Sequence, residues 1–132
     1  MKQIHHLCIQ TPDYEASKQF YEALGFELVQ ESSDFHTRAF NSWFKLGDFY
    51  IELQTAKQDE TLTAYSKHVA GPVHFALYVD DLEAEVRRLE ALGLPFLPKQ
   101  VCNIYFVVDG YLSKLKAPEG TIIELRDTFL IK

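Results

Sequence analysis

The sequence lacks any long hydrophobic run. No apolar stretch approaches the roughly 18 to 20 residues that a membrane-spanning helix requires. The first residues, Met-Lys-Gln-Ile-His-His, lead into no apolar segment or cleavage site typical of a secretion signal. We therefore expect a cytoplasmic protein that has no membrane partner.

Basic residues are also scarce. The chain carries 13 Lys and Arg against 19 Asp and Glu, which gives a formal net charge of −6 at pH 7. Proteins that bind nucleic acid neutralise phosphates with clustered Lys and Arg, and no basic stripe occurs in this sequence. The charge therefore argues against a nucleic-acid partner.

Cysteine is rare as well. The two cysteines, Cys8 and Cys102, show no CxxC or other metal-type spacing. In a chain without a secretion signal, two isolated thiols are expected to be free and reduced. The cysteine pattern thus argues against a fold held together by disulfides.

An internal repeat is the most informative feature of the 132 residues, of which 47% are hydrophobic. His6 is followed by Asp13 after seven residues and by a Leu-Gly pair after eighteen. His74 is followed by Asp81 and by a second Leu-Gly pair at the same offsets. Each half then closes with Ile-Glu-Leu, at 51–53 and at 123–125. The repeat predicts one domain built from two similar halves.

Each half predicts the same order of elements, namely a strand, a helix and then further strands. Asp13 and Asp81 are good N-cap residues, and a glycine follows each expected helix as a stop signal. The expected strands cover 4–10, 27–32, 36–46, 48–54, 73–79, 95–101, 103–109, 111–116 and 121–127, with helices at 13–24 and 81–92. The pattern predicts two βαβββ modules, at 1–54 and 72–132, joined by a linker at 55–71 with a weakly helical stretch at 60–69.

Alternation of side chains along these strands gathers polar groups on one face. Residues two apart on a strand share a face, so His6 lies on the opposite face from the apolar residues beside it. The same rule separates Glu52, His74 and Glu124 from the apolar neighbours on their own strands. A face that repeatedly carries a histidine or a carboxylate at its midpoint is typical of a polar cavity.

Two histidines and two carboxylates that converge would form a metal site. That donor set suits Zn, Ni, Co, Mn or Fe(II). The alternative is that each histidine is a hydrogen-bonded core residue and each glutamate an exposed strand residue, which is common for such residues taken singly. Because the repeat returns both residue types to equivalent positions, we favour one divalent metal ion as cofactor. Its expected ligands are His6, Glu52, His74 and Glu124.

Several motifs together resemble a known superfamily. They are Ile4-His5-His6 through Asp13, Phe20-Tyr21, Leu24-Gly25-Phe26, His74 through Asp81, and Pro118-Glu119-Gly120 through Leu125. This set resembles the vicinal oxygen chelate superfamily of glyoxalases, bleomycin-resistance proteins and ring-cleaving dioxygenases. The resemblance covers essentially the whole chain. It implies an α+β fold in which two βαβββ modules form a curved, cup-like mixed sheet of eight strands around a divalent metal, and it implies a homodimer.

The family's ligand positions fall on the same four residues. Members with a His-Glu-His-Glu set resemble glyoxalase I, in which the metal holds an enediolate and a carboxylate moves a proton. The resemblance therefore implies a metal-dependent lyase or isomerase that acts on a small carbonyl compound, a 2-oxoaldehyde or a thiol adduct, through a metal-bound enediolate. Glu124 is the expected base, and Glu52 is the second candidate.

Two positions depart from glutathione-dependent glyoxalase I. That enzyme has an arginine four residues after the first ligand and an asparagine four residues after the second, where this sequence has Gln10 and Ala56. A neutral amide cannot replace the bidentate grip of a guanidinium on a carboxylate. The sequence therefore argues against glutathione dependence.

Four more side chains are candidates for contact with a small-molecule substrate, namely Arg126, Tyr78, Trp43 and Gln10. The aromatic residues lie on strands that can line the cup, although core packing explains them equally well. Arg126 shares a face with Glu124 and can hold an anionic group. By alternation, the side chain of His5 should lie on the opposite face of the strand from His6, where it would pack in the core or lie at an interface.

Two other functions stay open. A non-haem Fe(II) ring-cleaving dioxygenase would share the fold, but these enzymes typically use two histidines and one glutamate. A bleomycin-resistance-type dimer would bind a cationic drug without catalysis, which the net charge of −6 permits. The complete set of metal donors favours the lyase or isomerase, because a pure binding protein has no need for them.

Overall fold

The computed structural model describes residues 1–131. The chain divides into two compact units, one spanning Met1–Ala64 and one that begins at Tyr65. Each unit contains one helix and one four-stranded sheet. Within the described residues, no helix is long and apolar enough to cross a membrane.

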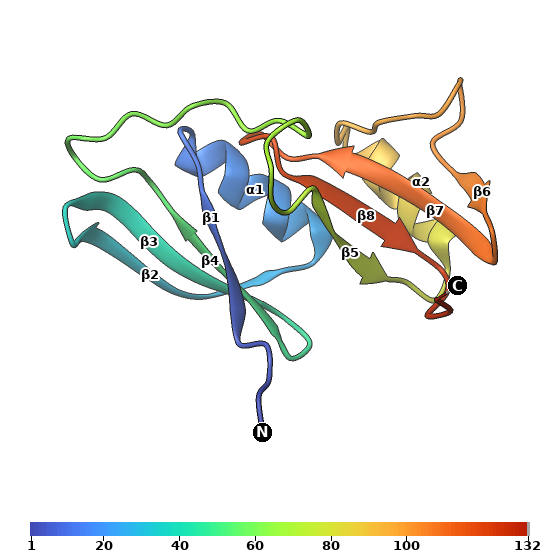
Figure 1. The fold of residues 1–132 in the computed structure, drawn as a ribbon, viewed down its shortest axis with the longest axis horizontal. Helices are drawn as coiled ribbons and strands as arrows, with labels where there is room; N and C mark the ends of the chain where they lie inside the picture. The colour runs from blue at the N-terminus through green and yellow to red at the C-terminus, as the bar shows by residue number, and fades with distance from the viewer. Residues whose placement is uncertain (132) are drawn as a thin grey trace. The chain divides into compact units, whose positions relative to one another are not determined.

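The first unit folds in the order strand, helix and three strands (Figure 1). Its elements are β1 (His6–Gln10), α1 (Tyr14–Leu24), β2 (Glu27–Phe35), β3 (Arg38–Leu46) and β4 (Phe49–Gln54). The strand order in the sheet is β1-β4-β3-β2, with β1 parallel to β4 and the other neighbours antiparallel. The first and last strands of the unit therefore lie side by side.

The second unit repeats this arrangement. Its elements are β5 (His74–Tyr78), α2 (Leu82–Ala91), β6 (Tyr105–Val107), β7 (Gly110–Lys116) and β8 (Ile122–Arg126). The strand order is β5-β8-β7-β6, and β5 and β8 are the parallel pair. The predicted α+β fold with two βαβββ modules is confirmed, with its strands distributed over two four-stranded sheets.

Both helices begin at the predicted aspartates. Asp13 Oδ1 accepts a hydrogen bond from the backbone N–H of Ala16, at 3.2 Å, and Asp81 Oδ1 accepts one from that of Ala84, at 3.0 Å. These bonds satisfy backbone donors that the first helical turn leaves unpaired. At the other end of α1, Gly25 adopts a φ of 107°, a left-handed conformation that favours glycine and ends the helix.

The apolar face of each sheet packs against the helix of its own unit, with α1 against β4 and α2 against β7. In the first unit the fully buried apolar side chains are Tyr21, Phe44, Ile51 and Leu53. In the second they are Val86, Leu89, Leu115, Ile123 and Leu125. The apolar residues on β4 and β8 alternate with Glu52 and Glu124, so the carboxylates project from the opposite face.

One predicted strand does not form. The sequence predicts a strand over 95–101, but the structure has only isolated bridges there, such as the one between Phe96 and Leu115. Pro95 and Pro98 have no backbone N–H to donate to a ladder. The segment therefore lies along β7 but does not join the sheet as a strand.

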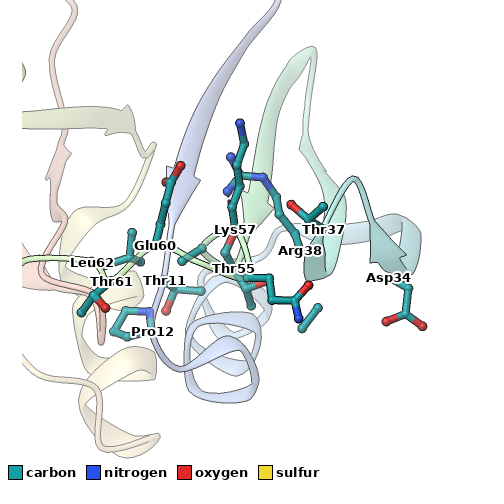
Figure 2. Close-up of a pocket in the computed structure, with 13 residues that line it drawn as sticks. Thr11, Pro12, Asp34, Thr37, Arg38, Thr55, Lys57, Glu60, Thr61 and Leu62 are labelled. Carbon is teal, nitrogen blue, oxygen red and sulfur yellow. Dashed lines mark hydrogen bonds between the residues drawn. The ribbon is translucent and has the colours of Figure 1, made fainter.

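The segment after β4 is irregular, and the weak helix predicted over 60–69 is absent. One isolated bridge joins Lys57 to Arg38 at the start of β3, and Gln58 N–H donates to Thr37 O at 2.9 Å. Together with the end of β1 and the turn between β2 and β3, this segment borders a cavity of about 790 Å³ (Figure 2).

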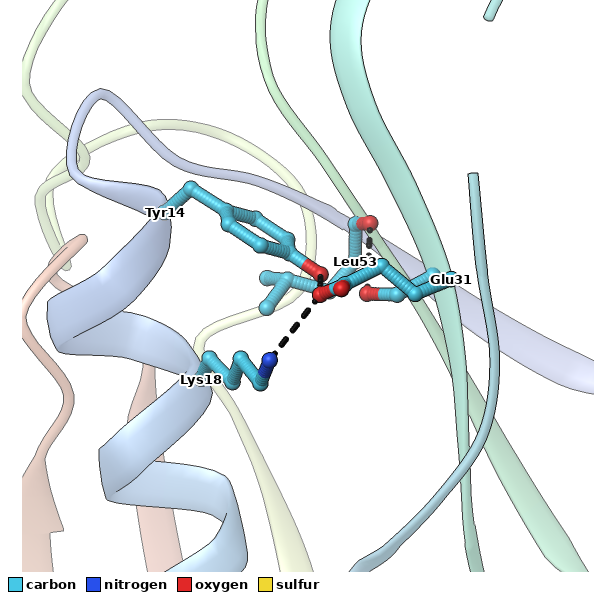
Figure 3. Close-up of polar contacts among 5 residues, drawn as sticks. Tyr14, Lys18, Glu31 and Leu53 are labelled. Atoms are coloured by element: carbon cyan, nitrogen blue, oxygen red, sulfur yellow. Dashed lines mark hydrogen bonds and ion pairs between the residues drawn. The ribbon is translucent and has the colours of Figure 1, made fainter. Parts of the chain in front are cut away.

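A polar cluster fastens α1 to β2 (Figure 3). The hydroxyl of Tyr14 donates to Glu31 Oε2, and Lys18 Nζ lies 3.0 Å from the same oxygen. The hydrogen bonds from Tyr14 and Lys18 hold the pKa of Glu31 below its usual value of 4.5. The carboxylate is thus kept charged between a phenol and an ammonium group, which links the helix to the edge of the sheet.

Replacing Glu31 by Gln should lower the free energy of unfolding at pH 7 but not at pH 3. A carboxylate whose pKa is lowered in the folded state stabilises the fold above its unfolded pKa, and this contribution is lost as the pH falls through the folded pKa. Because the Glu31 side chain is 33% exposed, the effect at pH 7 should stay below about 1 kcal/mol. Urea unfolding followed by circular dichroism measures it.

The matched control is Glu27→Gln on the same strand, which should change little at either pH. An effect of Glu31→Gln that is equally large at pH 3 and pH 7 would contradict the electrostatic link.

Candidate metal centre

The polar face of the first sheet brings a histidine and a carboxylate together. Cys8 pairs with Glu52 across the parallel strands β1 and β4, and His6 lies two residues before Cys8 on the same face. The Nε2 atom of His6 lies 3.5 Å from Oε1 of Glu52, and the two side chains are 32% and 18% exposed. A ligand can therefore reach the pair from solvent.

The second sheet carries an equivalent pair. Ala76 pairs with Glu124 across β5 and β8, and His74 lies two residues before Ala76. The Nε2 atom of His74 lies 3.5 Å from Oε1 of Glu124, the same separation as in the first unit, although the Glu124 side chain is only 7% exposed. The sequence repeat is thus a repeat of side-chain geometry within each unit.

This separation fits two ligands of one metal ion. A histidine nitrogen and a carboxylate oxygen each bind a divalent metal at about 2.0 to 2.2 Å, which puts adjacent ligand atoms about 3.0 to 3.5 Å apart. An ordinary N–H···O hydrogen bond is shorter, at about 2.7 to 3.2 Å. The distance within each pair therefore matches the distance between two adjacent ligand atoms of one metal ion.

A single pair is only part of such a sphere. Over residues 1–131, no group of three or more His, Cys, Asp or Glu side chains is placed to hold a metal ion. Catalytic zinc sites use three protein ligands and structural ones use four. Neither unit by itself therefore supplies a complete set of protein ligands.

His5 lies against the first pair, which differs from the prediction by alternation. Strand β1 begins at His6, so the alternation of the strand does not govern the residue before it. The Nδ1 atoms of His5 and His6 are 2.8 Å apart, and the His5 ring stacks on Tyr50 with centroids 6.1 Å apart. A partner on Nδ1 orients a histidine ring and leaves Nε2 available as a ligand. The His-His dipeptide was the only sequence signal for this role.

Trp43 forms a wall beside the same pair. It is opposite Glu52 in the register of β3 and β4, and its ring lies edge-to-face with that of His6, with centroids 4.8 Å apart. Aromatic rings next to a polar site exclude water and offer a surface for an organic ligand. The side chain is half-buried, so part of it stays accessible to such a ligand.

Cys8 is a free thiol on the same polar face. Its pKa is raised to about 11, first by desolvation and then by the charge of Glu52 and a hydrogen bond to that carboxylate, while the charge of Arg38 lowers it. The thiolate is the nucleophilic form of cysteine. At neutral pH, Cys8 is therefore a hydrogen-bond donor to Glu52 and a poor nucleophile.

In the second unit, Arg126 lies beside Glu124. Arg126 Nη1 is 3.7 Å from Oε2 of Glu124, whose other carboxylate oxygen faces His74. The Nε atom of Arg126 is buried and has no hydrogen-bond partner among the described residues. Both side chains line a cavity of about 220 Å³ with apolar walls that include Leu112 and Leu130. This small cavity combines a carboxylate, a guanidinium and an apolar surface.

Tyr78 lies next to Arg126 in the register of β5 and β8. Its ring stacks on Phe129 of the C-terminal segment, with centroids 4.0 Å apart, and the residue is 41% exposed. The structure thus brings Tyr78 near the predicted anion-binding arginine, packed against the chain's own C-terminal segment.

Gln10 is engaged by an arginine that the sequence reasoning missed. Arg38 Nη1 donates to Gln10 Oε1 at 3.0 Å and to the backbone oxygen of Thr55 at 2.6 Å. Arg38 lies on a different strand, 28 positions from Gln10, and the internal repeat does not mark it. No spacing pattern in the sequence could have pointed to this contact.

Comparison with known families agrees with the fold. Residues 5–105 match the profile of a family described as the glyoxalase/bleomycin resistance protein/dioxygenase superfamily. The chain is 34% identical to the uncharacterized protein YaeR of Escherichia coli strain K12, with 95% of each chain covered. It is 30% identical to the uncharacterized protein YwkD of Bacillus subtilis strain 168, with 74% of this chain and 77% of the relative covered.

Solved structures share the fold as well. A glyoxalase family protein from Enterococcus faecalis is 25% identical, with a TM-score of 0.74 over 96% of this chain and 98% of the neighbour. The fosfomycin resistance protein FosX from Listeria monocytogenes, solved with Mn(II) and sulfate, is 15% identical, with a TM-score of 0.74 over 98% of this chain and 95% of that one. The second likeness concerns the fold alone.

Replacing Glu52 by Gln should make Cys8 more reactive toward iodoacetamide at pH 8. The carboxylate raises the pKa of the thiol through its charge and its hydrogen bond, so its loss should increase the thiolate fraction several-fold. Mass spectrometry of the alkylated protein follows the rate, in a Cys102→Ser background that leaves one thiol.

Glu22→Gln, on the exposed surface of α1, is the control and should leave the rate unchanged. If Cys8 in the unmodified site reacts as fast as a cysteine in the urea-unfolded chain, the raised pKa is wrong.

Proposed function

The chain belongs to the glyoxalase/bleomycin resistance protein/dioxygenase superfamily, and we propose that it is a metal-dependent lyase or isomerase of the glyoxalase type. The observation that carries the proposal is the histidine–glutamate pair that recurs in both units with the same separation of 3.5 Å between Nε2 and Oε1. An enzyme of this class acts on a small carbonyl compound, a 2-oxoaldehyde or its adduct with a thiol.

The two pairs would together supply four ligands to one divalent ion. The proposed ligands are His6, Glu52, His74 and Glu124, and two nitrogens with two oxygens suit Zn, Ni, Co, Mn or Fe(II). The Mn(II) in the Listeria neighbour belongs to the same class of ion. We take the active form to be a homodimer, as is common among the members of this superfamily.

A bound divalent ion would stabilise negative charge on the oxygen of a coordinated carbonyl group and so acidify the neighbouring C–H bond. The chain's own part in the reaction is then to move that proton. Glu124 is the proposed base, because its side chain is largely buried and is held between His74 and Arg126. Glu52, which accepts a hydrogen bond from Cys8, is the second candidate.

The proposed substrate contacts surround the two pairs. Trp43 offers an aromatic wall beside His6, and Arg126, with Tyr78 next to it in the sheet, offers a positive charge beside Glu124. Gln10 is already bonded to Arg38, so it contributes to the site through that arginine. Because Gln10 and Ala56 replace the arginine and the asparagine of glutathione-dependent glyoxalase I, we propose that glutathione is not required.

Removing any one proposed ligand should weaken metal binding. We expect about one divalent ion per chain in the unmodified protein. After Glu124→Gln the metal affinity should fall by at least about 100-fold. Loss of a residue that hydrogen-bonds to a metal ligand typically lowers the affinity by about 10- to 100-fold, and loss of a ligand itself should lower it at least as much. Plasma mass spectrometry after dialysis gives the stoichiometry, and competition with a chromophoric chelator gives the affinity.

His68→Ala, in the exposed segment before β5, is the matched control and should bind metal normally. Near-zero occupancy that added metal cannot raise would overturn the proposed enzyme and favour a metal-free drug-binding dimer. Oxygen consumption with a catechol would instead favour the ring-cleaving dioxygenase.

Activity should depend on the metal and on Glu124. With methylglyoxal as substrate, in the presence and absence of added thiols, a chelator should abolish turnover, and Ni, Co, Mn or Zn should restore it to different extents. Among samples of equal metal content, Glu124→Gln should lower kcat by about 100-fold or more, the range typical of a lost general base. A larger loss of kcat in Glu52→Gln than in Glu124→Gln would assign the base to the first unit.

A further inference from the structure

A cavity of the first unit lies near the end of β1. It has a volume of about 790 Å³ and is bordered by the residues after β1, the turn between β2 and β3, and the segment after β4. Its lining includes Thr37, Arg38, Thr55 and Lys57 (Figure 2). None of these residues is part of the metal-binding pair, so the cavity needs an explanation of its own.

Arg38 is held at this cavity by neutral partners. Its Nη1 donates to Gln10 Oε1 at 3.0 Å and to the backbone oxygen of Thr55 at 2.6 Å. In the part of the chain that the structure describes, Arg38 forms no ion pair with an Asp or Glu. The guanidinium is therefore fixed in position while its positive charge stays uncompensated.

A second cation lies near it. Lys57 is exposed, its backbone pairs with that of Arg38, and Figure 2 shows both side chains extending to the same side of the segment. Asp34 and Glu60 also line the cavity, and among the described residues neither forms an ion pair with these cations. Figure 2 shows Asp34 pointing away from them and Glu60 extending to the same side of the segment as Lys57. Arg38 and Lys57 thus place two cations at the side of the cavity next to Gln10.

The position of Arg38 relates the cavity to the metal-binding pair. Gln10 and Gln54 pair across β1 and β4, two residues beyond Cys8 and Glu52 on the same face. Two residues along a strand correspond to about 7 Å. A single ligand molecule that contacts Glu52 with one atom and Arg38 with another group would therefore need several bonds between the two.

We propose that Arg38, assisted by Lys57, binds a carboxylate on the substrate and that this cavity selects carbonyl compounds with an acidic arm. The planar fork of a guanidinium matches a carboxylate, and both existing hydrogen bonds of Arg38 use a single nitrogen. The identity of the reacting centre rests on the proposed function, whereas the carboxylate site depends only on residues of the first unit.

The test is a titration of the metal-free, ¹⁵N-labelled full chain with succinate, followed by NMR through the side-chain Nε–H of Arg38 and the backbone amides of Thr37 and Lys57. Succinate should bind in the millimolar range, and the neutral dimethyl succinate should not. Arg38→Gln should weaken succinate binding by about 10-fold or more, the loss typical of a charged hydrogen bond, and Arg38→Lys should retain part of it.

The matched control is Arg87→Gln, which removes an exposed guanidinium from α2 that pairs with Glu83 and should leave succinate binding unchanged. If Arg38→Gln fails to fold, Lys57→Gln replaces it and should weaken binding several-fold, since Lys57 is exposed and its side chain forms no ion pair among the described residues.

Equal binding of succinate and dimethyl succinate, or unchanged affinity in the Arg38 and Lys57 variants, would overturn the proposal. If inorganic phosphate binds more tightly than succinate and this binding is lost in Arg38→Gln, the proposed carboxylate site is wrong and the site binds phosphate instead. Because the titration needs no metal and no turnover, a chain that binds succinate but no metal would refute the proposed enzyme while leaving this site intact.

Discussion

The pairing of two parallel strands within each unit determines where the polar side chains lie. In β1–β4 and again in β5–β8, the residue two after the histidine stands opposite the glutamate. Alternation then places both groups on the face that the helix does not cover, while the apolar residues between them fill the core. The same backbone register that buries Ile51 and Ile123 therefore delivers an imidazole and a carboxylate to within 3.5 Å of each other.

How far the sequence predicts this site depends on how regular the backbone is. His6 and Glu52 lie inside strands, where a period of two is reliable, so alternation predicted the face on which both lie. His5 precedes the strand and escapes the rule, and Arg38 meets Gln10 only through tertiary pairing. The strand predicted over 95–101 fails for a local reason, because its two prolines remove the donors that a ladder requires.

The two units give the same pair different surroundings. Cys8 faces Glu52 with a neutral thiol, and the equivalent position opposite Glu124 is Ala76. In the second unit a guanidinium, Arg126, lies beside the carboxylate instead. The histidine and the glutamate thus recur in both units, while the residues beside them differ. Glu52 has an uncharged thiol as its neighbour, and Glu124 has a cation.

The C-terminal segment has a practical consequence for work with this protein. Leu130 and Ile131 line the cavity that contains Glu124 and Arg126, and a peptide fused after Lys132 would be separated from Ile131 by one residue in the sequence. A polyhistidine tag fused ahead of Met1 would begin only five residues before His6. Affinity tags at either end therefore bring foreign imidazoles close to the donor pairs, and untagged protein is the appropriate material for counting bound ions.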